Sequence, residues 1–278
     1  MHATELHQAY VFDLDGTIYL GDHLLPGAAR LIQELRRRDI PVRFLSNNPT
    51  KDPQQYVAKL EQLGLPTDIS DIANTVVTTT RWLKEHRPDA TLFVVGEAPL
   101  KGALTQAGFR LSEDPTEIDI VVASYDRTFD YRKLQIAFDA IWVHRRAVLI
   151  QTNPDRFCPF PGGRGEPDCA AITAAIEACT GTKSMVNLGK PSPIMLEEAL
   201  RGLNVDPTQC LMVGDRLGTD IQMALNTGMA SALVLTGETT AEDIAALGED
   251  HLPTYVLDRI DQLIPQQIWD ELGWSISD

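Results

Sequence analysis

The segment YVFDLDGT, residues 10–17, joins a short apolar run to a polar turn. Residues 10–12 predict a buried strand, because a short apolar run bounded by turn residues is typical of strands covered on both faces. Asp13 and Asp15 follow at a spacing of two, so in an extended segment their side chains point the same way. Gly16 then allows a sharp turn out of the strand. The segment therefore predicts a strand whose carboxyl end carries two carboxylates.

Outward from this strand, two periodicities alternate along the chain. Short apolar runs predict further strands at residues 42–45, 211–213 and 231–235. Apolar residues at i, i+3, i+4 and i+7 predict helices that cover residues 28–35, 56–63, 196–203 and 221–225, the last ended by Gly228. Strands that alternate with helices in this order indicate an α/β fold, a Rossmann-like parallel sheet with helices on its faces.

The middle of the chain has strands and helices of its own. Apolar runs predict strands at residues 92–95, 118–123 and 148–151, and helix spacing begins at Leu134 and Ile172. We therefore predict a second α/β domain, residues 78–185, inserted into a core domain of residues 1–77 and 186–278. Near the end of the chain, Ile268, Trp269 and Leu272 predict a helix that docks on its own domain, with a homodimer contact as the alternative.

The composition excludes several classes of partner. Hydrophobic residues make up 44% of the 278 residues and the net charge is -15, which is typical of a globular but strongly acidic protein. Such a charge repels nucleic-acid backbones and anionic membranes, so we expect neither as a partner. It also repels phosphate esters, unless a cation reverses the field at one site.

The cysteines and the chain start indicate a reducing compartment. The four cysteines form no CxxC pair, so we expect buried free thiols. The first residues contain no basic segment followed by an apolar run, and no stretch reaches the roughly 18 apolar residues of a membrane helix. We therefore expect a cytoplasmic protein.

Polar residues follow three of the predicted strands. Asp13 and Asp15 follow the first, Ser46-Asn47-Asn48 the second, and Gly214-Asp215 the third. In open α/β sheets ligands bind beyond the carboxyl ends of the strands, so these side chains predict one site. Three carboxylates suit Mg²⁺, which prefers oxygen ligands. Lys190, before a predicted helix, adds the fixed positive charge that a phosphate group needs.

Each of these residues also has a structural alternative. An Asp before Gly often makes only a turn, and Ser46 would serve as a helix N-cap. A single lysine such as Lys190 is most often solvated. Asp215 and Asp220 would cap the following helix, and for Asp220 this alternative is a serious competitor. All four features in this order at strand ends favour a functional site.

Four motifs resemble those of the haloacid dehalogenase-like superfamily. They are DLDGT from Asp13, SNN from Ser46, GKPSP from Gly189 and GDRLGTD from Gly214. The segments VVASYDRTFDYRKL (121–134) and TNPDRFCPFPGG (152–163) are similar to the inserted C2-type cap domain of the p-nitrophenylphosphatase or NagD-like branch. The resemblance covers roughly residues 9 to 245 and implies that residues 78–185 are a cap that closes over the site and selects the substrate.

The resemblance implies a role for each matching residue. Asp13 would attack phosphorus to form an aspartyl-phosphate, and Asp15 would act as general acid and base. Asp13, the backbone carbonyl of Asp15 and Asp215 would hold Mg²⁺, with Asp220 in the outer shell. Ser46, Asn47 and Lys190 would bind the phosphoryl group.

The cap departs from the family pattern at Asp168, where members commonly carry a small residue. Asp168 is either a helix N-cap or an acceptor for the hydroxyls of a sugar or polyol phosphate. Phe157 and Phe160 would shape the same pocket or simply pack the cap. The resemblance therefore leaves the substrate of this chain unassigned.

The leading hypothesis is a Mg²⁺-dependent phosphatase acting on small phosphorylated metabolites, with sugar or polyol phosphates first. Nucleoside monophosphates and pyridoxal phosphate are the alternative substrates. A phosphomutase and a dehalogenase are less favoured, because the cap resembles the phosphatase branch and dehalogenation needs neither Mg²⁺ nor an acid at Asp15. The alternative from a different class is a non-catalytic protein that binds phosphometabolites.

Overall fold

The computed structural model describes residues 2–160 and 163–276, and the chain divides into two compact units. Unit 1 consists of Met1–Ser46, Val57–Ala73 and Leu196–Asp278, and unit 2 consists of Asn47–Tyr56 and Asn74–Met195. The domain boundaries expected from the sequence, at 77/78 and 185/186, stay a prediction.

A six-stranded sheet with the order β14-β13-β12-β1-β4-β5 forms the centre of unit 1. Neighbouring strands run parallel from β14 to β4, and all five residues of β1 are buried, as expected for a strand covered on both faces. The strand bounds are β1 Ala9–Asp13, β4 Val42–Ser46, β5 Ile72–Asn74, β12 Cys210–Gly214, β13 Ala230–Val234 and β14 Tyr255–Leu257. The small pair β2 Tyr19–Leu20 and β3 His23–Leu24 follows β1. The predicted α/β fold with a parallel core sheet is confirmed.

The helices around this sheet mostly follow the predicted spacing. They are α1 Ala28–Arg37, α2 Pro53–Gln62, α7 Pro193–Ala199, α8 Gln222–Thr227, α9 Ala241–Ala245 and α10 Gln266–Glu271. The apolar stripe of α1 is fully buried, and Gly228 ends α8 in the left-handed conformation, at φ 71°. The helix predicted for residues 196–203 is wrong in extent, because α7 ends at Ala199 and Gly202 turns the chain at φ 79°.

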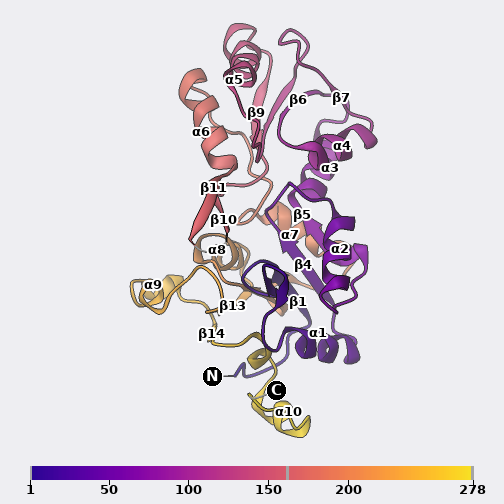
Figure 1. Cartoon of the computed structure of the whole chain (residues 1–278), viewed down its shortest axis with the longest axis vertical. Helices are drawn as coiled ribbons and strands as arrows, with labels where there is room; N and C mark the ends of the chain where they lie inside the picture. The colour runs from indigo at the N-terminus through magenta and orange to yellow at the C-terminus, as the bar shows by residue number, and fades with distance from the viewer. Residues whose placement is uncertain (1, 161–162, 277–278) are drawn as a thin grey trace. The chain divides into compact units, whose positions relative to one another are not determined.

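Unit 2 contains a separate four-stranded sheet of parallel strands in the order β7-β6-β8-β9. In Figure 1, α5 and α6 lie on one side of β6 and β9 while α3 and α4 lie on the other, and each pair covers its own apolar cluster. The bounds are β6 Thr91–Val95, β7 Arg110–Leu111, β8 Ile120–Ala123 and β9 Val148–Gln151 for the strands, and α3 Thr75–His86, α4 Ala98–Gln106, α5 Tyr131–Phe138 and α6 Cys169–Thr180 for the helices.

An antiparallel hairpin, which the sequence did not predict, precedes α6 in unit 2. It consists of β10 (Phe157–Phe160) and β11 (Arg164–Pro167). Tyr125, which follows β8, donates its hydroxyl to Glu166 of β11, and Arg127 Nε donates to the same carboxylate at 2.8 Å. Burial and the bond to Glu166 raise the pKa of Tyr125 above its ordinary range, so Tyr125 stays protonated and keeps donating.

The C-terminal helix α10 packs within its own unit, as predicted. Trp269 is 4% exposed, and the Arg30 guanidinium of α1 lies 4.6 Å from the Trp269 ring centroid and 4.8 Å from that of Trp274. Arg30 also pairs with the buried carboxylate of Asp261 at 2.7 Å. Among the described residues, no helix is long and apolar enough to span a membrane.

Candidate active site

Asp13 and Asp15 take up different environments at the end of β1. Asp13 is the last residue of the strand and is 8% exposed, whereas Asp15 is exposed and forms a bridge with Tyr19. The chain bends at Leu14, so the extended geometry expected between Asp13 and Asp15 is wrong, whereas the turn expected at Gly16 is confirmed by its φ of 86°. Tyr19 Oη donates to Asp15 Oδ2 at 3.1 Å, which gives the exposed carboxylate a fixed partner.

Asp215 follows β12 and is held by the loop that follows β13. Asp215 Oδ2 accepts the backbone N–H of Glu238 at 2.7 Å, and its backbone carbonyl accepts the N–H of Thr239 at 3.2 Å. The loop comes so close that a Cβ at Gly237 would lie 1.9 Å from Asp215 Oδ2, and one at Gly16 would lie 2.7 Å from it. Two glycines therefore permit the backbone to enclose this carboxylate.

Asp220 lies inside the turn that follows β12 rather than at its start. It is 0% exposed and belongs to η4 (Leu217–Ile221), the π-helical turn that precedes α8. Asp220 Oδ2 accepts the backbone N–H of Arg216, four residues before it, at 3.1 Å. The alternative weighed for Asp220, an N-cap of the following helix, is wrong, because the N-cap of α8 is Ile221 and α8 has no side-chain cap. A Cβ at Gly214 would lie 2.2 Å from Asp220 Cγ, so the glycine brings this carboxylate against the end of β12.

Three carboxylates of unit 1 converge on a small volume. One oxygen each of Asp13, Asp215 and Asp220 lies within 4.8 Å of the others, and all three residues are buried. Gathering this much negative charge away from water is costly unless a cation neutralises it. An all-oxygen donor set with no histidine or cysteine fits a hard cation such as Mg²⁺ better than zinc or copper.

Ser46 ends the strand next to β1. The register pairs Asp13 with Leu45, so Ser46 is one residue beyond the partner of Asp13. Ser46 is 5% exposed and is the last residue of β4. Its position beside Asp13 follows from the parallel pairing, as the motif positions predicted.

Asn47 and Lys190 lie together in unit 2. Asn47 Oδ1 accepts the backbone N–H of Lys190 at 2.8 Å, and Asn47 Nδ2 donates to the Lys190 carbonyl at 3.2 Å. Lys190 is 2% exposed, so it is not the solvated surface lysine weighed as its alternative. Contact between Asn47 and the Lys190 backbone has no local sequence signal, because 143 residues separate the two.

Asp168 has the geometry of a helix N-cap. It precedes α6, is 4% exposed, and its Oδ1 accepts the N–H of Cys169 at 2.5 Å and the Nδ2 of Asn153 at 3.2 Å. Phe157 and Phe160 of β10 are 44% and 39% exposed, so they do not pack the interior of unit 2. Phe157 instead lines a shallow hollow with Arg156, Arg164 and Glu166.

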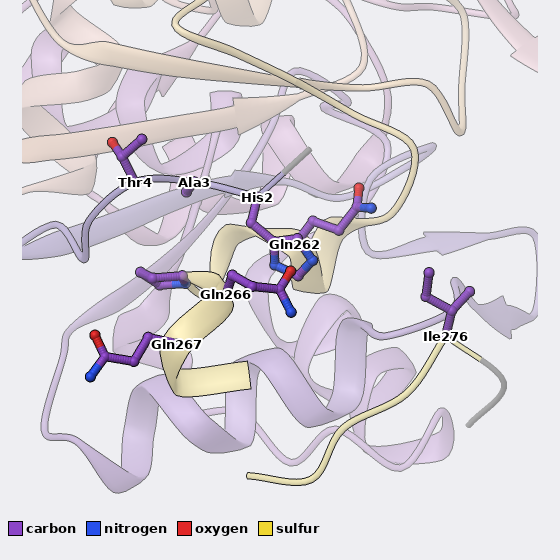
Figure 2. Close-up of a pocket in the computed structure, with 8 residues that line it drawn as sticks. His2, Ala3, Thr4, Gln262, Gln266, Gln267 and Ile276 are labelled. Atoms are coloured by element: carbon purple, nitrogen blue, oxygen red, sulfur yellow. The ribbon is translucent and has the colours of Figure 1, made fainter. Parts of the chain in front are cut away.

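A further hollow in unit 1 lies away from the residues singled out above. Figure 2 shows it between the N-terminal segment and the start of α10. Its lining consists of His2, Ala3, Thr4, Gln262, Pro265, Gln266, Gln267 and Ile276. His2 is the one titratable side chain in this lining, which gives the hollow no pair of groups for acid–base chemistry.

Comparisons with known proteins identify the family of the chain. A family model described as haloacid dehalogenase-like hydrolase matches residues 10–110, and a second, described as HAD-hydrolase-like, matches residues 187–263. The acid sugar phosphatase of Staphylococcus aureus is 34% identical over 261 residues, which cover 94% of this chain and 98% of that protein.

Solved structures of phosphatases are also similar to this chain. The 4-nitrophenylphosphatase of Thermotoga maritima has a TM-score of 0.86 and 32% identity, covering 92% of this chain and 96% of that one. NagD from E. coli K-12 has a TM-score of 0.81 and 26% identity, covering 92% of this chain and 98% of that one. The chain therefore belongs to the haloacid dehalogenase-like hydrolase family, and it is a phosphatase of the NagD-like and p-nitrophenylphosphatase branch.

Proposed function

We propose that the chain is a Mg²⁺-dependent phosphatase that hydrolyses small phosphate monoesters through an aspartyl-phosphate on Asp13. The observation that supports the proposal is the buried cluster of Asp13, Asp215 and Asp220, in which the proposed nucleophile is one of three carboxylates whose oxygens suit a hard cation. Sugar or polyol phosphates are the favoured substrates, because the Staphylococcus aureus relative is an acid sugar phosphatase.

Two proton transfers accompany the reaction. A carboxylate oxygen of Asp13 forms a bond to phosphorus while the bond from phosphorus to the leaving oxygen breaks. Asp15 gives its proton to that oxygen, and the alcohol departs. Asp15 then takes a proton from water, whose oxygen attacks phosphorus and releases phosphate and the Asp13 carboxylate. Tyr19, hydrogen bonded to Asp15 at 3.1 Å, orients the acid for both steps.

Asp13, the backbone carbonyl of Asp15 and Asp215 would hold Mg²⁺, with Asp220 further out. When bound, Mg²⁺ supplies positive charge that offsets the charge on the carboxylates and on the phosphoryl oxygens. The loop amide of Glu238 fixes Asp215 at 2.7 Å, so this ligand is oriented by the chain itself.

Ser46 and Lys190 are the proposed phosphoryl-binding side chains, through a hydroxyl donor and a fixed ammonium charge. In unit 2, Phe157 and Phe160 are the proposed substrate contacts, since both are exposed on the hairpin. A substrate role for Asp168 stays a prediction, because its carboxylate caps α6 at the N–H of Cys169 and accepts a second hydrogen bond from the Asn153 side chain.

Alternative functions differ in what they require of these residues. Nucleoside monophosphates and pyridoxal phosphate need the same chemistry at Asp13 and differ only in what the cap recognises. A phosphomutase must protect a bisphosphate intermediate from water. A non-catalytic binding protein has no need of a nucleophile, whereas Asp13 and its partner acid Asp15 are both present.

Turnover of p-nitrophenyl phosphate with and without Mg²⁺ tests the proposal. We expect turnover that depends on Mg²⁺ and is abolished in Asp13→Asn. In the absence of metal the melting temperature of Asp13→Asn should be no lower than that of the wild type, because the substitution removes one of three buried like charges. A screen of phosphorylated metabolites ranked by kcat/KM then identifies the substrate class. Absence of Mg²⁺-dependent turnover with every phosphate ester tested would refute the proposed function, and retained activity in Asp13→Asn would remove Asp13 as nucleophile.

A further inference from the structure

Two asparagine side chains hold the backbone of the segment that carries Lys190. Asn47 accepts the N–H of Lys190 at 2.8 Å and donates to its carbonyl at 3.2 Å. Asn187 forms the same two kinds of hydrogen bond with Gly189, the residue before Lys190: it accepts the N–H of Gly189 at 3.3 Å and donates to its carbonyl at 2.9 Å. Each asparagine therefore makes the two-point contact that a neighbouring strand would make with one residue.

The close approach of Asn47 depends on the glycine before Lys190. A Cβ at Gly189 would lie 2.7 Å from Asn47 Oδ1 and 2.6 Å from the carbonyl oxygen of Thr152. Both distances are too short for a real side chain. Residue 189 is thus packed between Asn47 and Thr152, the residue after β9, and this packing leaves the Lys190 backbone little freedom to shift.

Asp155 fixes Asn47 in turn. Asp155 Oδ2 accepts Nδ2 of Asn47 at 3.0 Å and Nδ2 of Asn153 at 3.0 Å. Asn153 also donates to Asp168, the N-cap of α6, at 3.2 Å. A chain of hydrogen bonds therefore runs from the start of α6 through Asp155 to the backbone of Lys190.

The hydrogen-bond donors of the Asn47 side chain decide whether it binds the phosphoryl group or holds the backbone of Lys190. A side-chain amide has two N–H bonds to donate. One goes to Asp155 and the other to the Lys190 carbonyl. Phosphate oxygens at neutral pH mostly accept hydrogen bonds, so a phosphoryl contact would require Asn47 to give up one of these two partners.

We propose that Asn47 and Asp155 are positioning residues for Lys190, and that the Asn47 side chain acts on the phosphoryl group only through that lysine. The inference rests on the proposed function, in which the Lys190 ammonium binds the phosphoryl group. Lysine is a point charge on a flexible four-carbon stem, so the place of its backbone decides where the charge can act. A misplacement of about 1 Å is enough to cost about 100-fold in rate.

A double-mutant cycle tests this coupling with kcat/KM for p-nitrophenyl phosphate in saturating Mg²⁺. Lys190→Ala should lower kcat/KM by about 10²–10³, the scale for losing one preorganised charge-stabilising group. Asn47→Ala should lower it by about 10–100-fold in the wild-type background, yet by less than about 2-fold in the Lys190→Ala background, because residues that act through one another are not additive. Equal losses in both backgrounds would show a direct phosphoryl contact and overturn the proposal.

Asn74 supplies a matched control in the same unit. It is 0% exposed, caps α3 by accepting the N–H of Val77 at 3.1 Å, and donates to the Lys51 carbonyl at 2.8 Å, so its side-chain amide forms these hydrogen bonds and not one to Lys190. Asn74→Ala should lower the melting temperature and change kcat/KM by the same small factor in both backgrounds. A non-additive effect of Asn74→Ala would mean that the cycle reports general loosening, and this too would overturn the assignment.

Two variants of Asp155, Asp155→Ala and Asp155→Asn, keep the proposal testable if Asn47→Ala does not fold. An asparagine at 155 can present one carbonyl oxygen to both amides, whereas alanine cannot. Asp155→Ala should lower kcat/KM by about 10-fold or more, and Asp155→Asn should stay within about 3-fold of the wild type. Equal losses of kcat/KM in the two variants would refute the proposed role of Asp155 in positioning Asn47. Wild-type protein without Mg²⁺-dependent turnover would instead refute the proposed function itself, so the two failures are distinguishable.

Discussion

Gly237→Ala should weaken Mg²⁺ binding without altering any residue that would hold the metal. A Cβ at this position would lie 1.9 Å from Asp215 Oδ2, whereas ordinary van der Waals contact begins at 3.4 Å. Either the carboxylate or the loop must therefore move by about 1.5 Å (3.4 minus 1.9). If the loop moves, the 2.7 Å bond from the Glu238 amide to Asp215 is lost; if the carboxylate moves, its place in the cluster is lost.

The expected magnitude follows from the geometric tolerance of metal sites. Metal–ligand distances are held to within about 0.2 Å, so a shift of 1.5 Å removes Asp215 as an effective ligand or leaves it unoriented. Loss of a hydrogen-bond partner that orients a ligand typically costs about 10–100-fold in metal affinity. We therefore expect the Mg²⁺ midpoint for p-nitrophenyl phosphate turnover to rise by about 10–100-fold, equivalent to about 1.4–2.7 kcal/mol.

Two measurements check this prediction. The first is the Mg²⁺ concentration that gives half-maximal turnover, and the second is the Mg²⁺-dependent rise in melting temperature, which needs no catalysis. Gly218→Ala is the matched control, because Gly218 lies in the turn between Asp215 and Asp220 and a Cβ there would meet nothing within 4 Å. An unchanged Mg²⁺ midpoint in Gly237→Ala, or an equal change in Gly218→Ala, would refute the steric reasoning.

Three further predictions concern other residues. Asp15→Asn should lower kcat by about 10²–10⁴-fold for alkyl phosphates and by less for p-nitrophenyl phosphate, whose leaving group needs no proton. Equal losses of kcat for the two kinds of substrate would refute the role of Asp15 as general acid. Asp168→Ala removes an N-cap, so it should cost about 1 kcal/mol of stability and lower kcat/KM equally for sugar phosphates and p-nitrophenyl phosphate; a loss confined to sugar phosphates would restore it as a substrate ligand. Burial opposes ionisation of Asp126, yet hydrogen bonds from Lys133 and Thr128 outweigh it and hold its pKa below the ordinary 3.8. The charge on Asp126 therefore stabilises the fold above pH 3.8 and ceases to do so as the pH falls through the lowered pKa. Asp126→Asn should lower the free energy of unfolding by about 1–2 kcal/mol at pH 7 in chemical denaturation, and this loss should shrink on acidification. A loss of stability that does not change with pH would contradict the predicted direction of the pKa shift.

Hydrophobic pattern predicted the strands that carry the site, because they are buried on both faces and read as apolar runs. The runs at residues 10–12, 42–45 and 211–213 became β1, β4 and β12. The hairpin β10–β11 had no such signal, since its strands are largely exposed and contain Pro159 and Pro167. Its place depends on contacts such as that of Tyr125 with Glu166, 41 residues apart, which no local pattern encodes.

Local sequence rules also misjudged the geometry immediately after β1. A spacing of two predicts one direction for Asp13 and Asp15 only while the chain is extended, and the bend at Leu14 removes that condition. The outcome is a buried Asp13 at the strand end and an exposed Asp15 in the turn. This difference suits the two proposed roles, because a nucleophile benefits from a dry, fixed position whereas an acid–base group must meet both the leaving alcohol and water.

The same argument explains why residue identity alone does not decide the role of Asn47. Its position after Ser46 at a strand end is equally compatible with binding phosphate and with holding another part of the chain. Only the three-dimensional partners decide, and both donors of its amide go to Asp155 and to the backbone of Lys190. A cation that must act at a fixed point needs a rigid backbone beneath its flexible stem. In the proposal Asn47, the residue after β4, supplies that rigidity, and for this reason the double-mutant cycle with Lys190, rather than the single Asn47 substitution, is the decisive measurement.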